Sequence, residues 1–331
     1  MGVYSGRQVQ VAAAVERVAG TSSAPTHNLI LDQKSFKRMV EKQINRNSIG
    51  LRAGSFSQHI FREHSGGMLS GFADADSLGL FLVAMFGRVP VSSGNRPSRA
   101  HTWSKAEEDN VLVTPLTLYR KTDNYQEVFN KCRASKVSLK MMENSYAEYE
   151  ADFMGLKGNA DTTNMPTPPG QASLSFFTPK NIEVKIADSE ATIAAAPNIR
   201  AKSCIINYNA KLSGYPGLGD VDYVEIGSLE YDMDIELTLL VDTDTLRQLW
   251  LSDEDRAFQV KMTGDRELVN SGATATPTFV LNVPAAKINA WGDTEPNGDF
   301  AEQTVTLRGF YHMTTGSTFK GILTNNTEDY R

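Results

Sequence analysis

Two segments of the chain alternate strictly between acidic and apolar positions. The longer segment, residues 229–237, places Glu230, Asp232, Asp234 and Glu236 between Leu229, Tyr231, Met233, Ile235 and Leu237. The shorter segment, residues 146–154, places Glu148, Glu150 and Asp152 between Ala147, Tyr149, Ala151 and Phe153. Successive side chains of a strand point to opposite faces, so the pattern predicts two half-buried strands with one acidic and one apolar face each.

A strand, an acidic cap and a helix follow one another in each half of the chain. The first copy reads Phe72-Ala-Asp74-Ala-Asp76-Ser-Leu78 and the second reads Leu240-Val-Asp242-Thr-Asp244-Thr-Leu246, at a constant offset of 168 residues, from 74 to 242. Asp74 or Asp76 in the first copy, and Asp242 or Asp244 in the second, can accept hydrogen bonds from the free amides of a helix start. The offset is close to half of 331 residues, which predicts a tandem duplication of one fold.

The remaining elements are short predicted strands punctuated by glycine and proline, with one helix in each half. Residues 76–87 are apolar on nearly all sides, which predicts a buried helix ending at Gly87. Three prolines and a glycine within residues 159–172 predict a linker at about 164–172. The fold class is therefore mainly β, a sandwich or partial barrel with one flanking helix, duplicated in tandem.

The expected division is a first β-sandwich domain at residues 1–163 and a second at residues 173–331. Within the first domain, residues 1–34 are small and polar and are expected to form an exposed arm. Residues 90–110 are a polar stretch with Gly, Pro and Ser, expected to be a long loop that is either functional or disordered in isolation.

Composition narrows the classes of function. The formal net charge of −6 and the pI of about 5.5 argue against a protein that holds nucleic acid through phosphate contacts. Cys132 and Cys204 lack metal-site or disulfide-scaffold spacing and are expected to be buried thiols in a reducing compartment. No segment has the pattern of a secretion signal or a membrane span, so we expect synthesis in a cytoplasm.

No catalytic constellation is found in the sequence. The five histidines are scattered, and no HExxH, GxSxG or GxxxxGK[ST] motif is present. The glycines at 214, 217 and 219 precede a strand and predict a turn, not a phosphate cradle. We therefore expect no enzyme activity, no cofactor and no metal, and a hydrolase using the acidic strands lacks a base, a nucleophile and a metal partner.

The two acidic faces allow three interpretations. A metal site is disfavoured because a straight strand spreads its carboxylates along roughly 20 Å. A solvated outer face is the common fate of charged strand positions. The third interpretation is a wet surface that stays negative so that a passing polyanion such as DNA does not adhere to it.

The sequence resembles the major tail proteins, or tail tube proteins, of long-tailed bacteriophages, in the version in which the tube fold is duplicated. The resemblance is carried by the two strand-to-helix units, DADSLGLFLVAMFG from Asp74 and VDTDTLRQLW from Val241, and by the strand ends YEADFMG from Tyr149, VTLRGFY from Val305 and GILTNN from Gly321. It covers residues 30 to 326.

The resemblance implies a structural virion protein whose stacked rings form the hollow conduit for phage DNA. Three duplicated chains are expected to close a pseudo-hexameric ring in which the sheets join into one barrel, with a hexamer as the alternative. The seven acidic residues of the alternating strands become candidates for the channel lining. Expected partners are further copies of the chain, a tape measure protein and tail terminator or tip proteins, with transient passage of DNA and no membrane.

A carbohydrate- or receptor-binding β-sandwich of the virion is the alternative function. Trp103, Trp291 and Tyr215, expected on loops, could stack on sugars. Packing in a core or an interface explains the same aromatic residues.

Overall fold

The computed structural model describes residues 9–45, 57–104, 114–122, 124–167, 174–240, 245–270, 273–292, 295–297 and 300–330. The elements of the first half are β1 Gln10–Val15, β2 His27–Asn28, β3 Gln33–Lys34, β4 Lys37–Asn45, β5 Ser57–Phe72, α1 Ser77–Phe86, β6 Val91–Ser93, β7 Arg99–Ser104, β8 Leu116–Lys121, β9 Gln126–Met142, β10 Glu148–Gly155 and β11 Asn159–Ala160. Those of the second half are β12 Phe177–Ala187, the 3-10 helix η3 Ile193–Ala195, β13 Ala201–Pro216, β14 Tyr223–Leu240, α2 Thr245–Ser252, β15 Arg256–Gly264, β16 Leu268–Asn270, β17 Ala273–Ala275, β18 Thr278–Trp291, β19 Glu295–Asn297, β20 Phe300–Phe310 and β21 Lys320–Asn325. The expected mainly β class is confirmed.

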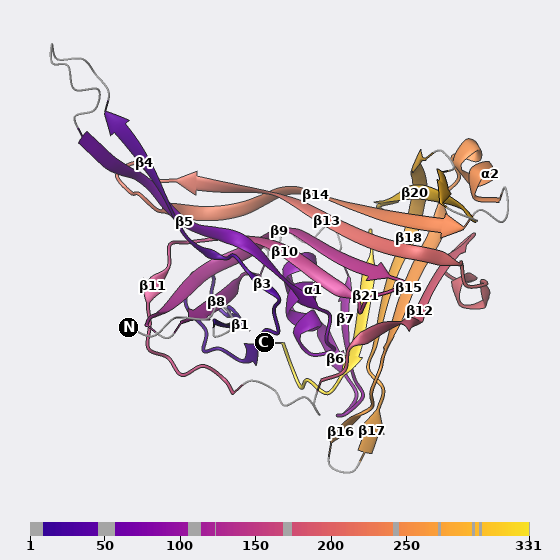
Figure 1. Ribbon diagram of the computed structural model, residues 1–331, viewed down its shortest axis with the longest axis horizontal. Coiled ribbons are helices and arrows are strands. Elements are labelled where there is room, and N and C mark those ends of the chain that lie inside the picture. Colours follow the sequence, from indigo (N-terminus) through magenta and orange to yellow (C-terminus); the bar gives the residue numbers. More distant parts are fainter. Residues whose placement is uncertain are drawn as a thin grey trace.

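One long antiparallel sheet runs through both halves of the molecule (Figure 1). Its strands follow the order β4, β5, β10, β9, β13, β14, β20, β18, β15 and β12. The pairing of β9 with β13 joins the first half directly to the second. Among the described residues the sheet does not close on itself.

The two halves have the same strand order. The first half pairs its strands as β1, β8, β9, β10, β5 and β4, and the second half pairs its strands as β12, β15, β18, β20, β14 and β13. Three register shifts also correspond: those at Leu116/Leu118, Asp152/Phe153 and Glu41/Lys42 match those at Arg256/Phe258, Ile288/Ala290 and Ala210/Leu212. A β-bulge is a specific feature of a fold, so three matching bulges are a strong structural likeness.

Helix α1 lies against one face of the long sheet, between it and strands β7 and β21 (Figure 1). All ten of its residues are buried, as the all-round apolar sequence predicts. Gly87 ends the helix in the left-handed conformation, with φ of 71°, and donates its N–H to the carbonyl of Val83. Both cysteines are free and buried. Most of the buried apolar side chains form one core that extends from β1 to β21, and a small second cluster consists of Ala12, Tyr119 and Val128.

Two expectations about the first half are wrong. The expected exposed arm, residues 1–34, contains β1, which is almost wholly buried and pairs with β8. The expected loop at residues 90–110 contains the hairpin β6–β7, whose second strand pairs with β21. His101 and Trp103 are fully buried and alternate with half-buried neighbours, so a strand period is present in a stretch of polar composition.

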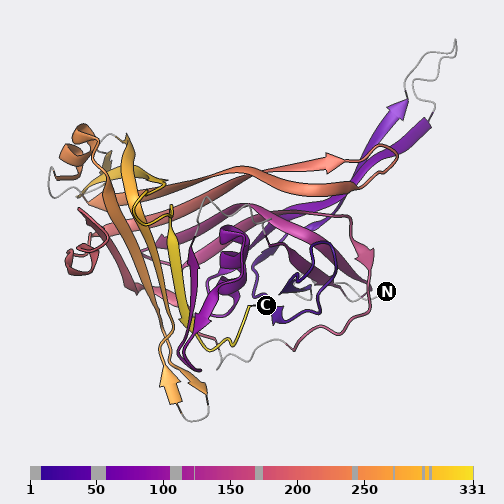
Figure 2. The ribbon, with the colours of Figure 1, turned by 180° about the vertical axis from the view of Figure 1, so that it is seen from behind.

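Two long hairpins, β4–β5 and β13–β14, project from the body in the same direction (Figures 1 and 2). They touch where the N–H of Glu63 donates to the carbonyl of Val221 at 2.8 Å. The guanidinium of Arg62 lies 5.3 Å from the ring centre of Tyr223. The hairpins occupy equivalent positions in the two halves.

Candidate functional site

The two acidic strands predicted from sequence lie on one face of the long sheet, the face opposite α1. Glu148, Glu150 and Asp152 of β10 are half-buried there, while Tyr149, Ala151 and Phe153 point into the core. Asp232, Asp234 and Glu236 of β14 are half-buried on the same face, and Glu230 is exposed. The side-chain alternation of both strands is present as expected.

The register aligns the two strands row by row. Glu150 shares a row with Asp234 through Ser138 and Asn207 of the intervening strands β9 and β13. The neighbouring rows join Glu148 to Glu236 and Asp152 to Asp232. Three strand spacings separate β10 from β14, about 14 Å. The fold therefore builds one polar surface, here called the polar face, from both halves.

Cations from other strands pair with several of these carboxylates. Arg308 of β20 lies 3.0 Å from Asp234 and 3.4 Å from Asp232. Lys140 of β9 pairs with Glu150, and Lys211 of β13 pairs with Glu230. Sequence reasoning found the carboxylates and missed the cations, because a strand's own alternation contains no information about its neighbours. The polar face is a mixed surface that is acidic only in part.

Of the four predicted helix-capping residues, the structure describes Asp74 and Asp76. The buried carboxylate of Asp74 accepts the N–H groups of Asp76 at 3.0 Å and Ser77 at 3.1 Å. Burial raises the pKa of Asp74, and the hydrogen bonds from Ser77 act in the opposite direction. Asp76 instead accepts a hydrogen bond from Thr327 at 2.8 Å, which ties the C-terminal segment to α1. Asp242 and Asp244 lie outside the described residues.

The aromatic residues proposed for sugar binding are not a group of loop residues. Trp103 lies in β7 and is fully buried, so it cannot form a platform. Trp291 lies in β18, stacked at 6.1 Å on Trp250 of α2. Tyr215 is exposed near the end of β13. The expectation that Trp103 and Trp291 lie on loops is wrong because both residues are packed within strands.

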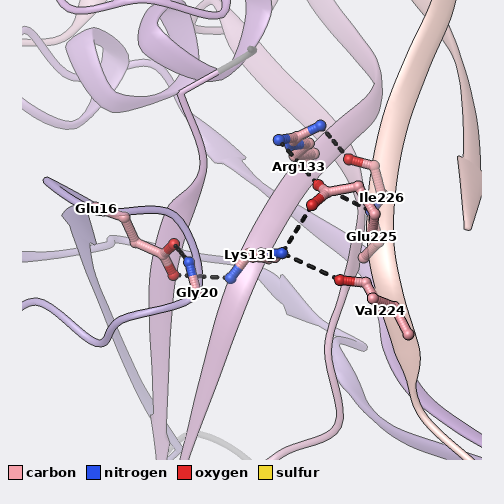
Figure 3. Close-up of polar contacts among 7 residues, drawn as sticks. All are labelled: Glu16, Gly20, Lys131, Arg133, Val224, Glu225 and Ile226. Atoms are coloured by element: carbon pink, nitrogen blue, oxygen red, sulfur yellow. Dashed lines mark hydrogen bonds and ion pairs between the residues drawn. The ribbon is translucent and has the colours of Figure 1, made fainter. Parts of the chain in front are cut away.

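An ion cluster that the sequence gave no reason to expect joins the two halves (Figure 3). The carboxylate of Glu225, at the start of β14, lies 2.9 Å from Lys131 Nζ and 3.5 Å from Arg133 Nη2. Arg133 also donates to the carbonyl of Ile226 and is only 2% exposed. Burial lowers the pKa of Arg133, while the charges of Glu225 and Glu16 raise it. The partners are more than 90 residues apart in sequence, which is why no local motif indicated them.

Glu16 connects the turn after β1 to the backbone of Lys131, whose side chain contacts Glu225 (Figure 3). Its buried carboxylate accepts the N–H of Gly20 at 2.7 Å, the N–H of Lys131 at 2.7 Å and the hydroxyl of Thr117 at 3.1 Å. Lys131 has a φ of 50°, which is uncommon for a residue other than glycine. The hydrogen bond to Glu16 helps to hold this conformation.

We expect the substitution Glu16→Gln to change how stability depends on pH. Burial raises the pKa of Glu16 above its ordinary value of 4.5, although its hydrogen bonds act against the shift. The native state then holds the proton more tightly than the unfolded state, so the stability contributed by Glu16 is greatest below pH 4.5 and is lost as pH rises through the native pKa.

Denaturant unfolding at a series of pH values measures this effect. The unfolding free energy of the wild type minus that of the variant should fall as pH rises from about 4.5. A difference that grows with pH would mean that the native state favours the charged carboxylate, contrary to this interpretation.

Neither a metal cluster nor a membrane helix is seen in the described ranges. Among these residues, no three His, Cys, Asp or Glu side chains gather so that they could hold a metal ion. No helix of the described part of the chain is long and apolar enough to cross a membrane.

Comparisons with known proteins give one family. A family model described as "phage tail tube protein" matches residues 6–307 of the chain. A search of curated proteins found no match.

Proposed function

The chain belongs to the family of phage tail tube proteins, and from this premise we propose that its rings form the hollow conduit through which phage DNA is delivered. Family membership makes the protein a structural component of the virion tail that assembles with copies of itself and with other tail proteins. The open long sheet is the observation that supports a conduit, because strand edges that are unpaired among the described residues can pair with another copy.

We propose that three copies close the ring. Each copy contributes eight strands to the wall: β4, β5, β10, β9, β13, β14, β20 and β18. Twenty-four strands spaced about 4.8 Å apart enclose a barrel roughly 37 Å across between backbones, and a strand tilt of about 40° widens it. The matching strand orders and bulges of the two halves support a duplicated fold divided at about residues 164–172, so that three chains supply six similar units.

The polar face is proposed to line the channel. In the barrel one face of the long sheet must point inward, and α1 with its apolar core occupies the other face. The carboxylates of the polar face would repel DNA phosphates. The cations beside them would reduce the negative electrostatic potential of the channel wall. No cofactor is needed for this role, and the tape measure and tail terminator or tip proteins are the proposed further partners.

Negative-stain microscopy together with native mass spectrometry of the purified protein tests assembly. The expected result is rings or tubes with a channel a few nanometres wide and three chains per ring. Six chains per ring would favour the hexamer. A protein that stays monomeric at all concentrations would contradict the proposal.

Reversing charge on the polar face should slow DNA release without preventing tail assembly. Asp152 and Glu236 suit this test because no ion pair is formed by either in the part of the structure described here. The double substitution Asp152→Lys and Glu236→Lys should slow ejection roughly tenfold or more, since cationic side chains attract the phosphates. Fluorescence recording of DNA release from purified virions measures the rate.

A matched variant controls for added positive charge. Glu190→Lys and Glu267→Lys place the same charges in loops outside the long sheet. Equal ejection rates in the two variants would show that the polar face does not meet the DNA.

A further inference from the structure

The contact between the two halves of one chain serves as a template for a contact between two chains. Strand β9 pairs with β8 as far as Cys132. Beyond that residue the same edge of β9 pairs with β13 of the second half. In this pairing Lys136 lies opposite Asn209 and Val137 lies opposite Tyr208. The first half thus offers the edge of β9, and the second half fills it with the first strand of its projecting hairpin.

The strand registers identify the counterparts of both partners. Ala151 pairs with Val137, and Val305 pairs with Trp291, so β18 corresponds to β9 at an offset of 154 residues, from 137 to 291. Gln33 pairs with Ser70, and Ser203 pairs with Thr238. Strands β3 and β4 therefore correspond to β13 at an offset of 170 residues, from 33 to 203.

Burial agrees with this correspondence. Phe36, between β3 and β4, is 3% exposed, and its counterpart Ile206 is 2% exposed. Both therefore fill the core from the same face of the sheet.

Both counterparts are open edges. Strand β18 pairs with β15 as far as Ala286. Beyond that residue, at Ala290 and Trp291, no described strand pairs with this edge of β18, while the opposite edge pairs with β20. Strands β3 and β4 pair with β5 on one side, and among the described residues no strand lies on the other. In the described part of the chain, the edge of β18 at Ala290 and Trp291 is therefore open to an added strand. The edge of β3 and β4 is open in the same way.

We propose that β18 of one copy pairs antiparallel with β3 and β4 of a second copy, Ala290 opposite Met39 and Trp291 opposite Arg38. This contact rests on the proposed tube function and specifies which edges meet and in which register. Repeated around the ring, this contact pairs the open edge of each β18 with β3 and β4 of the next copy and leaves neither edge free.

The side chains at the proposed contact are chemically complementary. Trp291 is half-buried and stacks on Trp250, which is 38% exposed. Arg38 is exposed and occupies the position equivalent to Tyr208, which is buried and lies opposite Val137 in the internal junction. In the proposed register Arg38, whose guanidinium lies 2.6 Å from the carboxylate of Glu63 in its own chain, is next to the indole pair, an arrangement that favours a cation–π interaction.

Disulfide trapping tests the register. Ala290 is exposed and Met39 is half-exposed, and the two native thiols are buried. The pair Ala290→Cys with Met39→Cys should give at least about tenfold more covalent dimer and trimer on oxidation than pairs displaced along β4, because a disulfide requires Cα atoms roughly 4.4–6.8 Å apart. The displaced pairs combine Ala290→Cys with Val40→Cys or with Lys37→Cys.

Two further pairs complete the experiment. Lys136→Cys with Asn209→Cys, at the equivalent internal junction, should form a disulfide within one chain and no dimer. Trp291→Cys with Arg38→Cys gives a second, independent reading of the register if the first pair folds poorly. Rings of each reduced variant are checked by microscopy.

The outcomes separate this inference from the proposed function. Dimers and trimers from the two matched pairs alone support the register. Rings that crosslink only through the displaced pairs, or through none, overturn the proposed contact and leave the tube function standing. A wild-type protein that forms no ring overturns both.

Discussion

Replacing Gly79 by alanine is expected to destabilise the protein by roughly 3–5 kcal/mol, the range for losing a buried aromatic side chain. In an ordinary helix the same change stabilises by about 1 kcal/mol. Here a Cβ atom at position 79 would collide with the ring of Tyr330. That ring is 1% exposed, and its hydroxyl donates to the carbonyl of Asp76 at 2.9 Å. Chemical denaturation of wild type and variant measures the loss.

A double variant identifies the cause. If the collision is responsible, Gly79→Ala in a Tyr330→Ala background should cost nothing further and should recover part of the helix propensity of alanine. An equal loss in both backgrounds would place the cause elsewhere. The tyrosine comes from the end of the second half and α1 from the first, so the experiment also measures how strongly the C-terminal segment fastens the halves together.

The second large effect is expected at the ion cluster between the halves, where Glu225→Ala should destabilise by roughly 1–3 kcal/mol, less than for a fully buried pair because the side chain of Glu225 is 46% exposed. The substitution leaves the buried guanidinium of Arg133 without its carboxylate. Burial raises the pKa of Glu225, but the hydrogen bond from Lys131 and the charges of Lys131 and Arg133 outweigh burial and hold it below its ordinary value. Unfolding by denaturant at neutral pH measures the loss.

Two comparisons sharpen this prediction. The pair Glu225→Ala with Arg133→Met should recover much of the lost stability, because an apolar side chain of similar length needs no counterion. The exposed-loop variant Glu267→Ala should change stability by less than about 0.5 kcal/mol. A loss at Glu225 no larger than that of the loop variant would show that Arg133 does not depend on this carboxylate.

Local patterns predicted much of the fold. The alternation around Asp234 and Glu150 predicted two strands and the correct buried face of each, because side-chain period is a property of the strand itself. The repeated acidic cap predicted the position of a helix in each half. The apolar run after Asp76 predicted that α1 is buried.

Other features depend on partners distant in sequence. Strand β1 was interpreted as an exposed arm because its burial comes from β8, about 100 residues away. The hairpin β6–β7 was interpreted as a loop because it is completed by β21 at the end of the chain. In both cases composition was polar or small, and only the pairing decided that the backbone is a strand.

The sequence by itself determined which residues of the two acidic strands alternate and where the helices begin, since each of these depends on a few neighbouring positions. That the fold is duplicated stays a prediction from the repeated strand-to-helix unit. Tertiary structure alone decided that β9 pairs with β13, that Arg308 and Lys140 lie among the carboxylates, and that Arg133 is buried against Glu225. The physical reason is that hydrogen-bonded register and ion pairing between strands depend on which edges meet, and the order of residues along one strand does not encode its neighbour.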